Sequence, residues 1–217
     1  MDSFNTITRF LQEGGIFMYP IMLVTAVGLA IAIERFIYLS ASKRSNQKMW
    51  EGLVPILESG DHHQIMQVAT ESDAPMGKVL AYGLSRSPLA RRRDDMETAM
   101  EEGLMEIIPN LEKRTHYLAT LANIATLLGL LGTIIGLIQA FTAVSNADPA
   151  EKANMLSSSI SVAMNTTAFG LIAAIPLLLA HAFLQSKTTS VVDGLEMAAV
   201  KFLNAITGGG RVEGERP

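Results

Sequence analysis

The feature that most constrains this chain is the uneven distribution of its charged residues. Three stretches contain no Asp, Glu, Lys or Arg: residues 14–33, 115–147 and 153–186. The hydrocarbon core of a bilayer is about 30 Å thick, and a helix needs roughly 20 apolar residues to cross it. Each of the three stretches is long enough. The sequence therefore predicts an all-α membrane protein with three transmembrane helices and long cytoplasmic helical extensions.

The composition excludes several other classes of protein. Charged residues make up 18% of the 217 residues, whereas soluble domains contain about 25%. The chain has no Cys, which excludes disulfide frameworks and thiolate metal sites. It also lacks a phosphate-binding loop, a dinucleotide-binding fingerprint and a metalloprotease helix. We therefore expect a protein that is not an enzyme, needs no cofactor and does not bind nucleic acid.

The orientation in the membrane follows from the Lys and Arg residues near the ends of each stretch, because these residues favour the cytoplasmic side. One side has Lys43, Arg44, Lys48, Lys113, Arg114, Lys187 and Lys201 near the membrane. The other side has only Arg9 and Lys152. The sequence predicts an external N-terminus and a cytoplasmic C-terminus.

The same reading gives a layout for the whole chain. We expect an external segment over 1–15, transmembrane helices over 16–39, 115–144 and 157–184, a cytoplasmic helical region over 40–114, an external loop over 145–156, a cytoplasmic amphipathic helix over 185–206 and a disordered tail over 207–217.

Turn residues and apolar periodicity add detail to the cytoplasmic parts. Pro55 and the turn residues after it are expected to divide residues 40–95 into short helices. From Met96 to Leu118, apolar residues recur at helical spacing and lead directly into the second span. We therefore expect one long helix there, bent at Pro109. A second apolar stripe, from Val191 to Ile206, predicts the amphipathic helix.

Small residues mark where the second and third spans should touch. Membrane helices associate where small side chains let their backbones approach. The second span has Gly129, Gly132 and Gly136, and the third has Gly170 with Ala174 at the same four-residue spacing. We expect these residues to form the contact between the two spans, as part of ordinary helix packing.

Polar side chains in these spans have two possible roles. Thr133, Thr166 and Thr167 are among the hydroxyl residues of the second and third spans. A membrane Thr often bonds the carbonyl one turn before it, but two polar stripes on neighbouring helices also suit a lining that faces protein or water. The three charge-free stretches contain no acidic residue, and His181 is the one histidine that lies more than two residues from the end of such a stretch. A carboxylate for proton transfer would have to come from a partner.

Three segments occur in a recognisable order: Glu34-Arg35-Phe36, the segment 130–136 (LLGTIIG) and the segment 166–176 (TTAFGLIAAIP). Together they resemble the MotA/TolQ/ExbB proton-channel family, and the short three-span layout resembles its ExbB/TolQ branch. The resemblance implies a homopentamer in the bacterial inner membrane, surrounded by lipid. It also implies an ExbD/TolR-like single-span partner that supplies a membrane Asp, and a TonB-like protein beyond it.

The resemblance also assigns an ion pathway. The two threonines that face the pore in this family correspond to Thr133 and Thr167, and the neighbouring Thr166 is a further candidate. Many relatives have a Glu five residues before the second Thr, where this chain has Val162. The transported ion, proton or sodium, stays open. Two other functions also stay open: a passive membrane scaffold without ion flux, and a flagellar stator subunit of the MotA kind, which would have four spans.

Overall fold

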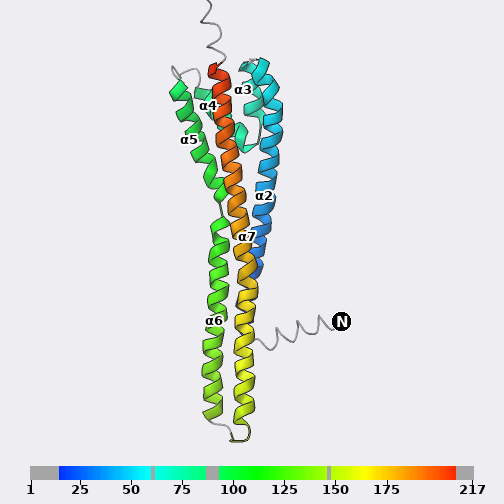
Figure 1. Ribbon diagram of the computed structural model, residues 1–217, viewed down its shortest axis with the longest axis vertical. Helices are drawn as coiled ribbons and strands as arrows, with labels where there is room; N and C mark the ends of the chain where they lie inside the picture. Colours follow the sequence, from blue (N-terminus) through cyan, green and yellow to red (C-terminus); the bar gives the residue numbers. More distant parts are fainter. Residues whose placement is uncertain (1–14, 60–61, 87–92, 146–147, 209–217) are drawn as a thin grey trace, which may run out of the picture. The chain divides into compact units, whose positions relative to one another are not determined.

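The computed structural model describes residues 15–59, 62–86, 93–145 and 148–208, and these residues are almost entirely helical (Figure 1). The helices are α2 (Met18–Ser59), α3 (His62–Glu71), α4 (Pro75–Arg86), α5 (Arg93–Glu112), α6 (Thr115–Ser145) and α7 (Lys152–Gly208). Three helical stretches are long and apolar enough to cross a membrane: Met18–Leu57, Arg93–Ser145 and Lys152–Ile206. The expected all-α fold with three candidate spans is confirmed.

The chain forms two compact units. The first, which we call the apolar unit, combines Met1–Glu34 with Arg114–Leu184. The second, which we call the charged unit, combines Arg35–Lys113 with Gln185–Pro217. Helices α2 and α7 each extend through both units, with one part in the apolar unit and the other in the charged unit.

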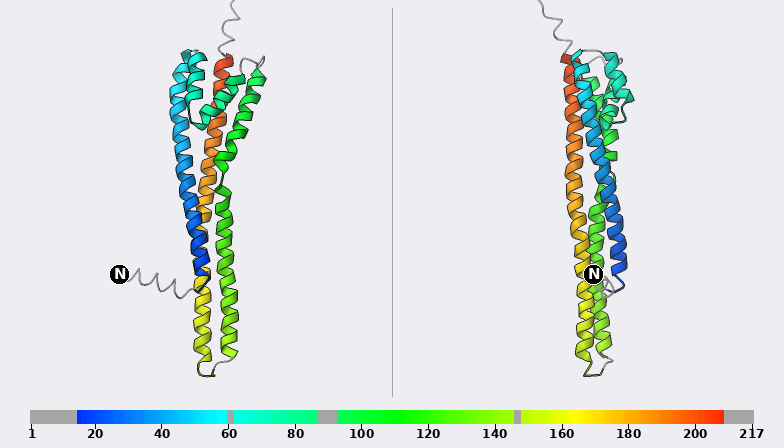
Figure 2. Two further views of the ribbon diagram at one scale, coloured as in Figure 1. Left: turned by 180° about the vertical axis from the view of Figure 1, so that it is seen from behind. Right: turned by 90° about the vertical axis from the view of Figure 1, so that its right-hand side faces the viewer.

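In the apolar unit, α6 and the first part of α7 lie side by side and run in opposite directions (Figure 2). Helix α2 packs against α7 where Gly28 faces Leu177: a Cβ atom added to Gly28 would lie 2.6 Å from Leu177 Cδ2. Most large side chains of this unit point outward. In the most apolar 18-residue window of each candidate span, only 17%, 28% and 28% of the residues are buried.

The charged unit has a core of large apolar side chains contributed by all of its helices. Fully buried members are Leu53, Ile65, Leu80, Leu195 and Phe202. Methionines fill much of the remaining space between the short helices and their neighbours: Met49, Met76, Met96 and Met100 are all buried. Helix α4 is anchored at its start because the Met76 backbone N–H donates to Oδ1 of buried Asn46 on α2, at 3.0 Å.

Some details of the helical layout differ from expectation. Pro55 lies inside α2 and does not end it, whereas Pro109 lies within a helix, α5, as expected. A proline removes only one intrahelical hydrogen bond, and a helix can continue through it with a bend. The prediction that this helix continues into the second span is wrong, because the helix is interrupted at residues 113–114, where Arg114 has a φ of 66°.

The amphipathic helix expected over 185–206 is not separate either. It is the last part of α7, which runs without interruption for 57 residues. Helix α7 also begins at Lys152, inside the stretch expected to be a loop. The expectations for the N-terminal segment up to residue 14 and for the tail from residue 209 lie outside the described residues.

Candidate functional site

Helices α6 and α7 meet along a row of small residues. A Cβ atom added to Gly170 would lie 2.8 Å from the Ala125 carbonyl oxygen and 3.0 Å from Gly129 Cα. One added to Gly129 would lie 3.2 Å from Gly170 Cα. Because these neighbours are backbone atoms, no side-chain rotation could make room. The two backbones therefore touch at Gly129 and Gly170.

The contact continues along both helices. A Cβ on Gly132 would clash with the Thr166 methyl group, and one on Gly136 would lie 2.9 Å from the Ala163 Cβ. Ala174 is also buried, at 2% exposure. We call this row the α6–α7 seam. It includes three alanines that spacing alone did not single out, Ala122, Ala125 and Ala163, each at most 2% exposed.

Thr166 lies within the seam. It is 2% exposed, its methyl group faces Gly132, and its hydroxyl donates to the Val162 carbonyl on the same helix at 2.9 Å. Val162, five residues before Thr167, is half-buried and lies next to Gly15: a Cβ atom added to Gly15 would be 3.3 Å from Val162 Cγ1.

Thr167 joins the two helices by a hydrogen bond. Its hydroxyl donates to the Gly129 carbonyl on α6 at 2.8 Å, and the side chain is half-buried. Gly129 is already bonded within its own helix, so this carbonyl can serve both helices because it has two lone pairs. With its proton used in this way, the Thr167 oxygen remains able to accept a hydrogen bond.

Thr133 lies one helical turn after Gly129 on α6. Its hydroxyl donates to the Leu130 carbonyl of its own helix at 2.6 Å, and the side chain is half-buried. The bond between Thr167 and Gly129 thus brings Thr167 to within about one turn of Thr133 along α6, whereas Thr166 points into the seam.

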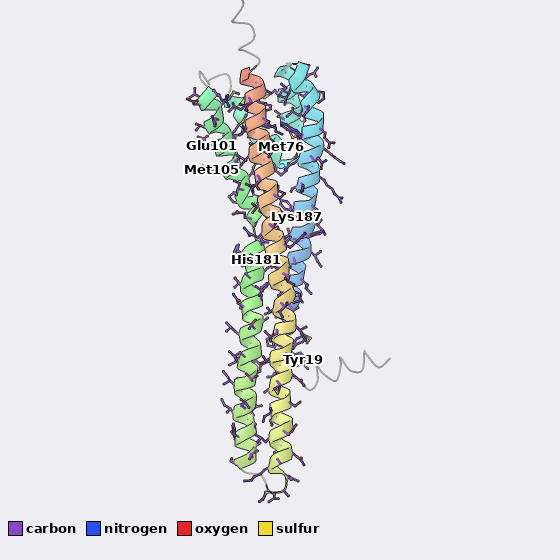
Figure 3. The ribbon with its side chains drawn as sticks, in the orientation of Figure 1. Tyr19, Met76, Glu101, Met105, His181 and Lys187 are labelled. Atoms are coloured by element: carbon purple, nitrogen blue, oxygen red, sulfur yellow. The ribbon has the colours of Figure 1, made fainter. Side chains whose placement is uncertain are left out.

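One polar contact near the start of α6 was not foreseen from the sequence. His181 Nδ1 lies 3.0 Å from the Thr115 carbonyl oxygen, and Figure 3 shows His181 next to α6. The neighbouring Arg114 forms an ion pair of 3.9 Å with Glu34, both partners being about half exposed. In the sequence, only the Lys113-Arg114 pair at the edge of a charge-free stretch pointed to polar contacts at this place.

Metal chemistry has no support in this unit. Among the residues that the structure describes, no group of three His, Asp or Glu side chains is placed to hold a metal ion. What the seam offers instead is hydroxyl groups and backbone carbonyls in an otherwise apolar surrounding. Such groups can hydrogen-bond to a proton-carrying side chain or contribute oxygen ligands to an alkali cation.

Several known proteins are similar in sequence to this chain. A putative biopolymer transport protein ExbB homolog from Methanothermobacter thermautotrophicus is 29% identical over 199 residues, which are 91% of this chain and 69% of the relative. The Tol-Pal system protein TolQ of Haemophilus influenzae is 37% identical over 109 residues, 50% of this chain and 46% of TolQ. Biopolymer transport protein exbB1 of Vibrio cholerae is 27% identical over 175 residues, 79% of this chain and 76% of the relative.

A family match covers more than half of the chain. Residues 71–197 fit the sequence profile of the MotA/TolQ/ExbB proton channel family. This range contains α4, α5, α6 and most of α7, including the entire α6–α7 seam. The chain therefore belongs to the MotA/TolQ/ExbB proton channel family, a family of channels rather than enzymes.

Proposed function

We propose that this chain is an ExbB/TolQ-like subunit of an ion-driven motor in the bacterial inner membrane. With an ExbD/TolR-like single-span partner, it converts an ion gradient into mechanical work on the cell envelope, such as import through a TonB-like protein. The names of its relatives, which include biopolymer transport proteins and a Tol-Pal system protein, support this process.

The observation that carries the proposal is the position of Thr167 and Thr133. The two hydroxyls lie about one turn apart along spans that contain no Asp or Glu. A partner Asp would exchange its ion beside them. Protonation lets a carboxyl group move through an apolar region that its ionised form cannot enter, and one charge crossing 100 mV releases about 2.3 kcal/mol. The change of charge then drives motion of the partner relative to this chain.

A ring of copies, with five as the proposed number, fits the large apolar surface of the spans. Fewer than a third of the residues in each span window are buried within the chain itself. Lipid covers part of this surface, and other copies and the partner cover the rest. We propose that α6 and α7 line the centre of the ring and that the first span faces lipid, with the N-terminus in the periplasm and the C-terminus in the cytoplasm.

The test removes each hydroxyl while keeping the shape of the side chain. Thr133→Val and Thr167→Val should leave expression and ring mass unchanged and should strongly reduce ion-driven transport in cells or in vesicles that contain the partner. Thr142→Val is the matched control, because Thr142 also lies on α6 and bonds its own helix, at 2.8 Å to Ile138. Full transport in both test variants, or an equal loss in the control, would place the pathway elsewhere.

A passive scaffold is the second candidate, since all three threonines hydrogen-bond backbone carbonyls in the absence of a partner. Ion flux through vesicles that hold this chain and its partner separates the two functions. The same vesicles identify the ion: replacing sodium by potassium at constant pH and membrane potential abolishes transport only if sodium is the coupled ion. Within the residues that the structure describes, three candidate spans favour the ExbB/TolQ branch over a four-span stator.

A further inference from the structure

A cavity of about 550 Å³ lies in the charged unit between α2 and α7. Its polar wall includes three basic side chains, Lys43 and Arg44 from α2 and Lys187 from α7, together with Ser40 and Gln47. Phe36, Ile37 and Ala41 form its apolar wall. Among the described residues that line it, none carries a carboxylate.

Lys187 is held at the junction of these two walls, and Figure 3 shows it between α7 and α2. Its ammonium group donates to Ser40 Oγ at 2.5 Å and lies 4.0 Å from the centre of the Phe36 ring. Lys43 donates to Ser190 Oγ at 3.4 Å, so it also bridges α2 and α7. Burial, together with the charges of Lys43 and Arg44, lowers the pKa of Lys187 below its usual value. The cavity therefore brings positive charges close together, and a bound anion would reduce the repulsion between them.

We propose that this cavity binds the headgroup of an anionic phospholipid, with the phosphate between Lys43, Arg44 and Lys187 and an acyl chain along Phe36 and Ile37. The proposal rests on the membrane boundary near residue 39 that the proposed function assumes. Phe36 and Ile37 are 48% and 61% exposed and come just before that boundary, whereas Lys43 and Arg44 come one turn after it. Apolar and cationic groups thus follow one another in the order in which a lipid presents its chain and its phosphate.

A soluble anion would use only half of this site. A free phosphate ester would contact the basic wall and leave the exposed Phe36 and Ile37 side chains in water. Basic residues near an anionic membrane surface each strengthen binding by a factor of about five. Three of them acting on one headgroup should distinguish an anionic lipid from a zwitterionic one on the order of 100-fold.

The experiment compares two triple variants of the full-length chain purified in detergent. One is Lys43→Gln, Arg44→Gln and Lys187→Gln, and the other is Lys48→Gln, Lys78→Gln and Lys201→Gln. Both remove three positive charges from the charged unit, but the second set does not line this cavity. Native mass spectrometry measures the binding of phosphatidylglycerol and phosphatidylcholine. We expect the first variant to lose phosphatidylglycerol binding on the order of 100-fold and the second to keep most of it.

A measurement on the unmodified chain keeps the proposal testable if the first variant does not fold. Acylating reagents modify accessible lysine amines, and because Lys187 lines the cavity, bound phosphatidylglycerol should protect its amine, whereas phosphatidylcholine should not. Equal binding of both lipids, or equal losses in both variants, would overturn the proposal. Protection of Lys187 by glycerol phosphate as good as that by the lipid would indicate a site for soluble anions instead.

A change in ring mass with unchanged lipid binding would make the cavity a contact between copies of the chain, which also overturns the proposal. These measurements need neither the partner nor an ion gradient. Failure of lipid binding would therefore leave the proposed ion-driven function untouched, and loss of ion flux would not affect the lipid result.

Discussion

The two units of this protein pack their helices with different kinds of side chain. In the apolar unit, α6 and α7 touch through glycine and alanine, and the large residues Leu127, Ile138 and Phe141 are more than half exposed. In the charged unit, the large residues are the ones inside: Leu53, Leu195 and Phe202 are fully buried.

The difference reflects the solvent that each unit is built for. In water, burying large apolar side chains drives folding. In lipid, a leucine gains little by leaving the acyl chains, so helices associate where their backbones can approach closely. The contrast within one chain supports assigning the apolar unit to the membrane, and it makes opposite predictions for substitutions in the two units.

The largest effect is expected from Gly170→Leu in the seam. Its Cβ would meet the Ala125 carbonyl oxygen and Gly129 Cα, so α6 and α7 would have to separate and the bond from Thr167 to Gly129 would break. We expect a loss of about 5 kcal/mol or more, measured by thermal unfolding in detergent. Gly194→Leu on the same helix is the control. Nothing lies within 4 Å of a Cβ added there, and leaving glycine should stabilise the helix by about 0.5–1 kcal/mol. Similar losses of stability at both positions would show that the close contact in the seam does not cause the loss at Gly170.

In the charged unit, shortening a side chain should be the damaging change. Phe202 is fully buried, and Phe202→Ala should cost about 3–5 kcal/mol because it leaves a cavity. Val200→Ala, two residues earlier and 52% exposed, should change stability by less than about 0.5 kcal/mol. Denaturant unfolding monitored at Trp50, the only tryptophan and a residue of this unit, reports both values. Equal effects of the two changes would contradict a core centred on Phe202.

The hydroxyls of the candidate pathway should matter little for stability. Thr167→Val removes one bond between helices, and such bonds in membranes contribute about 0.6 kcal/mol on average. Thr133→Val removes only a bond within its own helix and should cost less. Unfolding measurements on the two variants should therefore differ only slightly from the unmodified chain. A large loss of stability in Thr167→Val would show that Thr167 is a structural residue. A loss of transport in that variant could then be explained by its instability alone.

A small effect of opposite sign is expected from one buried hydroxyl in each unit. Thr115 in the apolar unit and Thr188 in the charged unit are 2% exposed, and neither hydroxyl has a hydrogen-bond partner among the described residues. Valine has the same shape without the unmet polar group, so Thr115→Val and Thr188→Val should each stabilise the protein by about 0.5–1 kcal/mol. Differential scanning calorimetry measures this. A destabilisation by either change would mean that its hydroxyl has a partner in the assembled protein.

Much of the fold could be predicted because membrane spans depend on simple composition. The charge-free stretches located α6 and the first part of α7, and the apolar stripe from Met96 correctly marked buried residues such as Met100, Leu104 and Leu111. The break at Arg114 could not be predicted, since a left-handed backbone at an arginine has no local signal such as glycine.

The orientation of the adjacent Thr166 and Thr167 side chains also could not be predicted from the sequence. Residues 166 and 167 point about 100° apart on a helix, and either could have faced α6. Contacts across the seam decide the matter: the methyl group of Thr166 faces Gly132, and the hydroxyl of Thr167 reaches the Gly129 carbonyl. Spacing along one helix does not carry this information, because the rotation of a helix is set by the surface of its neighbour.

The methionine-rich core of the charged unit also has a redox consequence. On α5, Met100 is 2% exposed and Met105 is 71% exposed, and Figure 3 labels Met105. Peroxide converts an accessible thioether to a polar sulfoxide, so Met105 should be oxidised in the folded protein, whereas Met100 should react only when the unit opens. The ratio of the Met100 and Met105 oxidation rates therefore measures how often the charged unit unfolds locally.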